Sequence, residues 1–316
     1  MSRWPDFLLV GAPKCATGTI YELLGRSPGV FGAPKDLYFF GSDLATTQPR
    51  LSLAEYHAQF EAAPAGARLA DSSVGYLCSE RAAGEIHAAV PGARIVIALR
   101  NPLDAIPSLH RHCLYYGLEE IEDLGEALAA EADRAAGRRM PRRCAHPWML
   151  LYTHVYRYAE QVQRYFDAFG RSSCHVVVYD DFRAEPDGTM DALRSFLELP
   201  APEPEEAAAD EPAPTELRVN RARRARSRRL SALLTDPPPL ARRLVRRLTP
   251  QPLRRRVAEG VLAANTAGDA PPPVDPAVRA ELAAAFAAEV ESVSRLLGRD
   301  LGHWLTTPRE AAGTAR

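Results

Sequence analysis

An apolar strand that runs into a glycine turn and then into an amphipathic helix constrains this chain more than any other feature. The segment is Phe7–Leu24, FLLVGAPKCATGTIYELL. The first turn of a helix leaves backbone N–H groups without intrahelical partners, at the positive end of the helix dipole. Lys14 adds a positive charge, and Thr17 and Thr19 add hydroxyl donors. The segment therefore predicts a cradle for a phosphate group.

The order of residues in this cradle differs from that of the Walker A loop. That loop needs G-x-x-x-x-G-K-[ST], with the lysine directly before the hydroxyl residue that holds Mg²⁺. Here Lys14 comes before the small-residue corner Ala16–Thr19 instead of inside it. A P-loop kinase or NTPase acting on a small molecule is an alternative, but the residue order disfavours it.

The pattern G-x-P-K-x-[GA]-T-x-[ST] resembles the 5′-phosphosulfate loop of sulfotransferases that use 3′-phosphoadenosine 5′-phosphosulfate (PAPS). A second segment supports the resemblance: the apolar run Ala93–Arg100, ARIVIALR, ends in Arg100, and Ser108 follows on the next predicted helix. A guanidinium at a strand end can hold a phosphate through two hydrogen bonds. The resemblance implies PAPS as co-substrate, no metal, and the following nucleotide-binding residues: Lys14, Cys15, Ala16, Thr17, Gly18, Thr19, Arg100 and Ser108.

Three further segments resemble the carbohydrate branch of this family, the heparan sulfate sulfotransferase type. They are Ala33–Phe40 (APKDLYFF), Leu69–Leu77 (LADSSVGYL) and Val274–Trp304. The resemblance implies that Lys14 and Asp36 are the catalytic residues. Asp36 would take the proton of the acceptor hydroxyl, and we expect it to be buried near Leu37, Phe39 and Phe40, where it would be a better base.

The chain departs from this pattern at several positions. Ser72 stands where the branch has a lysine that steadies the transferring group, and Thr266–Asp269 stands where a Lys-Gly-Arg loop closes on the 3′-phosphate. The sequence also leaves other bases open, namely Asp71, His110 and His112.

Short apolar strands alternate with helical segments along the first 199 residues, which predicts a parallel sheet with crossover helices. The predicted strands are Phe7–Val10, Arg68–Asp71, Arg94–Leu99 and His175–Tyr179. The predicted helices are Thr17–Arg26, Ser79–Val90, Leu103–Tyr116, Trp148–Phe169 and Pro186–Leu197. We expect an α/β fold, a P-loop-like three-layer sandwich with an added C-terminal helical lobe. Ligands of such sheets bind at the carboxyl ends of the strands.

Four regions are predicted, the first and the last from the extent of the resemblance and the two between them from composition. Residues 1–199 form the PAPS-binding core, 200–217 an acidic proline-rich linker, 218–264 a basic helical lid, and 265–316 a helix that completes the core and a tail. The basic lid has two interpretations. It is a nucleic-acid-binding arm or a lid that recognises an anionic acceptor, or it is a set of amphipathic helices whose leucines face the core. The helical spacing of the leucines favours the amphipathic helices.

The overall composition limits the partners of the chain. Its 39 basic and 40 acidic residues give a net charge of −1, so no global field draws it to nucleic acid or membranes. No apolar run is long enough to span a bilayer. Five scattered cysteines, and a first strand beginning near Asp6, lead us to expect a cytoplasmic protein with reduced thiols. The predicted reaction is in-line transfer of a sulfuryl group from PAPS to a hydroxyl of a carbohydrate or a glycosylated or secondary-metabolite acceptor.

Overall fold

A five-stranded parallel sheet forms the centre of the fold in the computed structural model, which describes residues 3–142, 144–200, 224–225, 260–261, 265–267 and 273–306. The strands lie in the order β2-β3-β1-β4-β5, and every neighbouring pair is parallel. Their bounds are β1 Phe7–Gly11, β2 Val30–Gly32, β3 Arg68–Ser72, β4 Arg94–Leu99 and β5 Cys174–Val178. β1 and β4 are almost wholly buried, as expected for inner strands covered on both faces.

The helices vary widely in length. Those before the sheet's last strand are α1 Thr17–Gly25, α2 Leu53–Ala58, α3 Ala82–Ala89, α4 Pro102–Tyr116, α5 Leu124–Ala129, α6 Glu131–Ala135, α7 Tyr152–Val155 and α8 Tyr158–Phe169. Those after it are α9 Tyr179–Ala184, α10 Pro186–Leu197 and α14 Pro276–Leu297. The 3₁₀ turns are η1 Pro147–Leu150, η2 Arg171–Ser173 and η3 Gly302–Leu305, and two short strands, β6 Arg224–Ala225 and β7 Thr266–Ala267, pair antiparallel.

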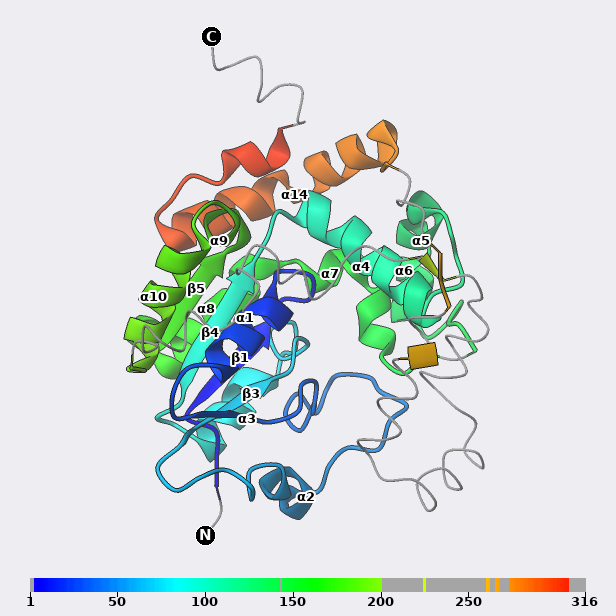
Figure 1. The fold of residues 1–316 in the computed structure, drawn as a ribbon. Helices are drawn as coiled ribbons and strands as arrows, with labels where there is room; N and C mark the ends of the chain where they lie inside the picture. The colour runs from blue at the N-terminus through cyan, green and yellow to red at the C-terminus, as the bar shows by residue number, and fades with distance from the viewer. Residues whose placement is uncertain are drawn as a thin grey trace.

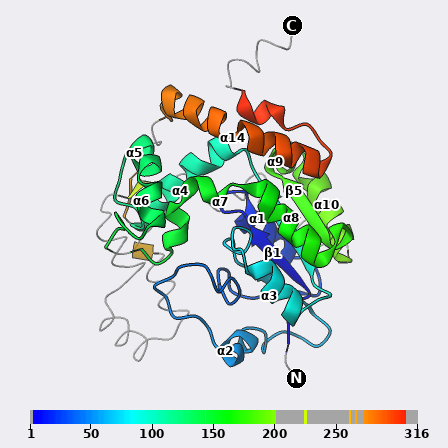
Figure 2. The same cartoon turned by 180° about the vertical axis from the view of Figure 1, so that it is seen from behind.

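Helices cover the sheet on both faces, which gives three layers. α1 and α10 lie together on one face, and α3 and α8 lie together on the other (Figures 1 and 2). α14 crosses near the carboxyl ends of the strands and packs against α4 and α8. The predicted α/β sandwich is thus confirmed, and α14 is the described part of the predicted C-terminal helical lobe.

The predicted helix Trp148–Phe169 is wrong as a single helix. The chain forms η1, α7 and α8 in turn, with breaks at Leu151 (ψ 67°) and Arg157 (ψ 75°). Tyr156 and Tyr158 are both fully buried. Two residues apart on a continuous helix they would point about 200° apart, so the break allows both side chains to enter the core.

Two other elements differ from the prediction. The helix expected from Ser79 begins at Ala82, because the Ser79 hydroxyl accepts the N–H of Ala82 (2.9 Å) and donates to Asp43 (2.5 Å). The short strand β2 was not predicted, since three partly exposed residues ending in glycine carry little strand signal. The backbone that follows β2 nevertheless continues beside β3, and Asp36 lies on this continuation, where its N–H donates to the Ser72 carbonyl.

Most of the predicted linker 200–217 and of the basic lid 218–264, and part of the segment Thr266–Asp269, lie outside the described residues. The four predicted regions therefore stay a prediction. Within the described ranges, no helix combines the length and the apolar character needed to cross a bilayer.

Candidate functional site

The loop between β1 and α1 has an unusual backbone. Gly11 (φ 145°), Lys14 (φ 64°) and Ala16 (φ 64°) all lie at positive φ. Gly11 is required here, because a Cβ on it would meet the Val74 carbonyl oxygen at 2.6 Å. The chain therefore turns sharply at the carboxyl end of β1, as predicted for a loop that wraps an anion.

Buried tyrosines and one arginine hold this loop from behind. The Tyr156 hydroxyl donates to the Pro13 carbonyl (3.1 Å), and the Tyr158 hydroxyl lies 3.6 Å from the Cys15 sulfur. Arg100 Nη1 donates to the Lys14 carbonyl (3.2 Å). Since the two tyrosines are themselves fully buried, the loop is pre-organised for a ligand.

The first turn of α1 offers open donors. The first bond of the helix runs from the Ile20 N–H to the Ala16 carbonyl (3.0 Å), and no side chain caps the helix. Neither Thr17 nor Gly18 donates its backbone N–H to another described residue. These amides therefore point to an anion site at the positive end of the helix dipole.

Three cations gather behind and beside the loop: Lys14, Arg100 and Arg111. Burial, together with the guanidinium groups of Arg100 and Arg111, lowers the pKa of Lys14 to about 8, while neighbouring Cys113 opposes the shift. Burial and Arg100 likewise lower the pKa of Arg111. Such mutual repulsion shows that like charges are held close together, and it would be relieved by a bound anion.

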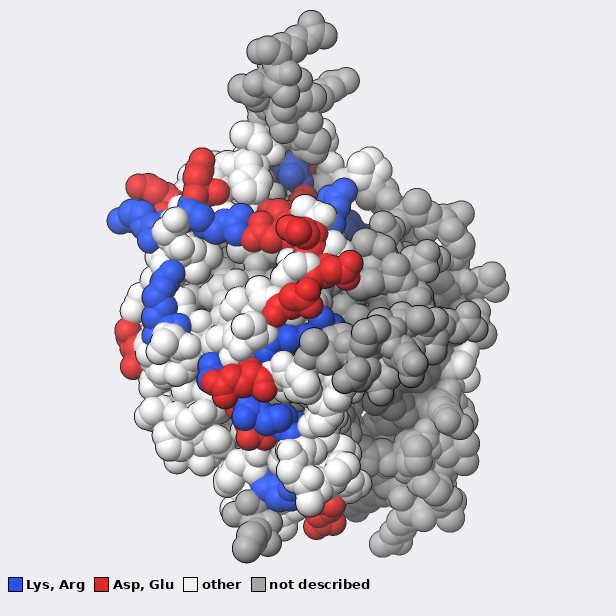
Figure 3. Space-filling view, turned by 60° about the vertical axis from the view of Figure 1, so that its left-hand side comes forward, with Lys and Arg blue, Asp and Glu red and all other residues white. Residues whose placement is uncertain are grey.

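These cations have no close ionic partner among the described residues, although the charge of Asp104 acts on Arg111 and opposes the lowering of its pKa. Lys14, Arg100 and Arg111 form no ion pair there, and Nε of Arg100 and Nε of Arg111 are buried without a hydrogen bond. Elsewhere positive and negative side chains are interspersed, as on the side that carries β5, α9 and α10 (Figure 3), where Arg299 pairs with Asp181. The loop is therefore a place where charge is left for a ligand.

Arg100 and Ser108 lie on consecutive parts of the chain, the end of β4 and helix α4. Arg100 directly follows β4, and its guanidinium lies over the Tyr179 ring, 4.6 Å from the centroid. Ser108 is half-buried on α4, three residues before Arg111, so the two share one helix face. The arrangement agrees with a phosphate held between a strand end and the following helix.

Asp36 lies at the carboxyl edge of the sheet, but it is not buried. Its N–H donates to the Ser72 carbonyl (2.7 Å), so the backbone after β2 still runs beside β3 at this point. Its side chain is exposed, so the expected burial is wrong. Positive φ values at Asp36 (61°) and Tyr38 (47°) redirect the chain, and Phe39 instead stacks on Tyr56 (4.2 Å).

Asp71 is a buried structural carboxylate. It is fully inaccessible and accepts hydrogen bonds from the hydroxyls of Tyr56 (2.9 Å), Tyr76 (3.2 Å) and Ser73 (3.3 Å). Burial raises the pKa of Asp71 to about 6, although these hydroxyls oppose the shift. Since its oxygens are occupied by the protein, Asp71 fits the role of a loop anchor better than that of a base.

The two histidines on α4 have different surroundings. His110 is buried with Nε2 2.9 Å from the Ile121 carbonyl, and burial lowers its pKa. His112 is half-buried, and burial together with the charges of Lys14 and Lys35 lowers its pKa to about 3. His112 is therefore neutral at physiological pH and lies within electrostatic reach of the loop lysine, whereas His110 is a packing residue.

The serine that stands where the heparan sulfate branch has a lysine lies in the central sheet. Ser72 pairs with Leu9 of β1, is fully buried, and its hydroxyl has no hydrogen-bond partner among the described residues. Sequence reasoning did not identify Arg111, Tyr158 or Tyr179 as parts of the site. Arg111 could have been found from its three-residue spacing after Ser108, whereas nothing local in the sequence marks the two tyrosines.

Comparisons with known proteins find similarity to sulfotransferases. Residues 54–203 match the sequence model of the sulfotransferase family, a range that includes Arg100 and Ser108 but begins after the β1–α1 loop. The bifunctional heparan sulfate N-deacetylase/N-sulfotransferase 1 of Mus musculus is 24% identical over 208 residues, which is 62% of this chain and 22% of that protein. The corresponding enzyme 2 of Bos taurus is 25% identical over 213 residues, again 62% and 22%.

The chain thus spans about a fifth of the length of these curated relatives. Among solved structures, a sulfotransferase from Alicyclobacillus acidocaldarius superposes with a TM-score of 0.68 at 24% identity, covering 96% of this chain and all of that one. At this level of identity the likeness shows a shared fold.

Proposed function

The chain belongs to the sulfotransferase family, and from this premise we propose that it transfers a sulfuryl group from PAPS to a hydroxyl of a carbohydrate or a glycosylated metabolite. The observation that carries the proposal is the group of unpaired cations, Lys14, Arg100 and Arg111, around a loop with open amides. PAPS carries phosphate at two ends and a sulfuryl group, so it matches several cations that lack counter-ions.

The donor would be held at two points. The amides of Thr17 and Gly18 and the ammonium of Lys14 would bind the 5′-phosphosulfate, at the positive end of α1. Arg100 and Ser108 would bind the 3′-phosphate, for which the buried, unpartnered Nε of Arg100 is a suitable donor. The fit supports PAPS as co-substrate, and the family relationship agrees with it.

The chemistry then depends on positioning and charge. The acceptor oxygen forms a bond to sulfur while the bond from sulfur to the bridging phosphate oxygen breaks, which leaves 3′-phosphoadenosine 5′-phosphate. Lys14 would neutralise the charge that develops on this leaving oxygen. Asp36, exposed at the carboxyl edge of the sheet, would accept the proton of the acceptor hydroxyl.

The test is sulfate transfer from labelled PAPS to a panel of sugars, glycosides and simple alcohols. The wild-type protein should label at least one hydroxyl acceptor, and Lys14→Ala should abolish the transfer. A control is Asp167→Asn, because Asp167 lies in the last turn of α8, which ends at Phe169 just before the amino end of β5 and so at the opposite edge of the sheet. Absence of labelling with every acceptor, together with phosphate transfer from ATP, would favour a kinase instead.

A further inference from the structure

The position of Arg100 depends on contacts with residues far away in the sequence. Its carbonyl accepts a hydrogen bond from the Tyr158 hydroxyl (3.0 Å), and its guanidinium lies on the Tyr179 ring at 4.6 Å. Its backbone and its charged group are thus held by two different elements, α8 and α9. An arginine side chain has many rotamers, so such contacts decide where its donors point.

The C-terminal turn η3 joins the elements on both sides of Arg100. The Trp304 carbonyl accepts a hydrogen bond from Asn101 Nδ2 (2.9 Å), and Trp304 Nε1 donates to Asp180 Oδ2 (2.6 Å). Asn101 follows Arg100 in the chain, and Asp180 follows Tyr179. Trp304 therefore links the β4–α4 turn, which carries the arginine, to the start of α9, which carries the ring beneath it.

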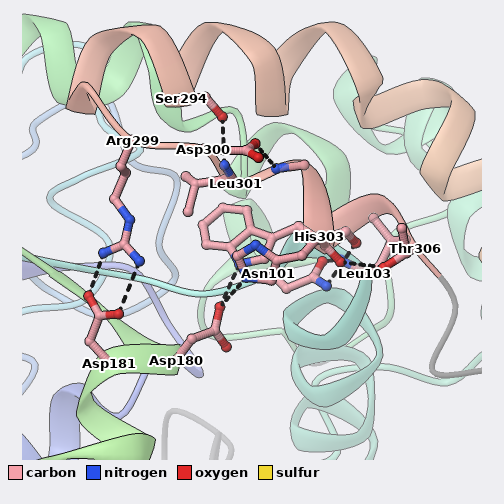
Figure 4. A network of polar contacts seen from close by, with 12 residues as sticks. Asn101, Leu103, Asp180, Asp181, Ser294, Arg299, Asp300, Leu301, His303 and Thr306 are labelled. Atoms are coloured by element: carbon pink, nitrogen blue, oxygen red, sulfur yellow. Dashed lines mark hydrogen bonds and ion pairs between the residues drawn. The ribbon is translucent and has the colours of Figure 1, made fainter. Parts of the chain in front are cut away.

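The surrounding contacts fix this link in place. Figure 4 shows Arg299 on Asp181 and His303 beside Asp180, so η3 and the turn before it are tied to α9 by side chains on both carboxylates. The Leu301 N–H donates to Ser294 Oγ (3.1 Å), which ties the same turn to α14. Trp304 is itself 1% exposed, so its indole has a single packed orientation.

We propose that Trp304 is a positioning residue: it holds the β4–α4 turn against α9, and thereby aims the Arg100 guanidinium at the 3′-phosphate of the donor without touching the ligand. Asp180 is the acceptor through which it acts. This inference rests on the proposed function, since it assigns to Arg100 the recognition of that phosphate. It explains the orientation of the Arg100 guanidinium by contacts with a C-terminal segment about 200 residues away in the sequence.

The experiment is calorimetric titration of the full chain with 3′-phosphoadenosine 5′-phosphate and with AMP, which lacks the 3′-phosphate. Trp304→Phe keeps most of the ring volume but removes the donor to Asp180. We expect roughly fivefold to tenfold weaker binding of the bisphosphate and unchanged binding of AMP. Trp148→Phe is the matched control, because Trp148 is also buried but its Nε1 has no partner among the described residues.

A double-mutant cycle separates positioning from a general loss of stability. In the Arg100→Ala background, Trp304→Phe should have no further effect on bisphosphate affinity, because the group that it aims is gone. An equal loss in both backgrounds, or an equal loss for AMP, would overturn the proposal. Thermal unfolding of each variant confirms that the titrated protein is folded.

A second variant keeps the test decisive if Trp304→Phe does not fold. Asp180 is partly exposed, and Asp180→Ala removes a negative charge next to Tyr179. Simple electrostatics would then strengthen the binding of an anion, whereas lost positioning weakens it. Weaker bisphosphate binding supports the proposal, and tighter or unchanged binding contradicts it. If the wild-type protein itself binds no bisphosphate, the proposed function fails first and the inference falls with it.

Discussion

The depressed pKa of Lys14 predicts that donor affinity falls as the pH rises above 8. Burial and the nearby guanidinium groups bring this pKa from 10.5 to about 8 in the free protein. An anion binds the protonated ammonium, so the bound state has a higher pKa and binding takes up protons. About nine-tenths of Lys14 is protonated at pH 7 and about one-tenth at pH 9, which predicts roughly tenfold weaker binding at pH 9.

Other groups near the loop do not titrate in this window. Burial raises the pKa of Cys15 to about 11, and His112, with a pKa of about 3, is neutral throughout. The ligand phosphates are ionised above pH 7, since their second pKa is about 6. A change in affinity between pH 7 and pH 9 therefore reports on Lys14.

The assay is calorimetric titration with 3′-phosphoadenosine 5′-phosphate at constant ionic strength, in two buffers of different ionisation enthalpy. The difference in heat should give an uptake of about half a proton at pH 8. Lys14→Arg is the control: its guanidinium stays protonated, so its affinity should be constant from pH 7 to pH 9. Constant affinity in the wild-type protein, without proton uptake, would refute the argument that repulsion and burial act on Lys14.

Three further predictions concern the loop, the core and the base. Gly11→Ala should lower the free energy of unfolding by about 2 kcal/mol or more, because a Cβ would meet a backbone oxygen at 2.6 Å. Gly25→Ala, which has open space around it, should not destabilise the protein, and chemical denaturation measures both variants. Glu119→Gln should cost about 3–5 kcal/mol in the same assay, since it leaves the buried Arg134 guanidinium without a carboxylate, and a loss below 1 kcal/mol would contradict this. Asp36→Asn should slow sulfate transfer by about 10²–10⁴-fold with unchanged donor affinity, and a normal transfer rate would exclude it as the base.

The central sheet was predictable because its signals are local. Three of its five strands, β1, β4 and β5, carry apolar runs of three or more residues, and the glycine after the first run marks the start of the anion loop. The sequence predicted no strand order; in the structure β1 pairs in parallel with β3 and β4, which brings Gly11, Ser72 and Arg100 to one edge. Lys14 and Arg100 were identified from the resemblance to the sulfotransferase loop and strand end, and the hydrogen bond from Arg100 to the Lys14 carbonyl shows that the two residues lie close together.

The rest depends on contacts that no local pattern contains. The break before Tyr158 exists because two tyrosines must both reach the loop, and the exposure of Asp36 follows from two residues at positive φ. The hydrogen bonds of Trp304 join positions 203 and 124 residues apart. Such tertiary contacts override helical periodicity and local composition, so they cannot be predicted from a single sequence.

The most direct test of the account is the affinity of the purified protein for 3′-phosphoadenosine 5′-phosphate compared with ATP and AMP, measured by calorimetry. We expect the bisphosphate to bind far more tightly than the other two nucleotides. Lys14→Ala should weaken the binding of all three nucleotides through the 5′ side, and Arg100→Ala should remove the preference for the bisphosphate over AMP. If ATP binds as well as the bisphosphate, or if neither substitution changes the affinity, the assignment of this loop and strand end to a sulfotransferase donor site is wrong.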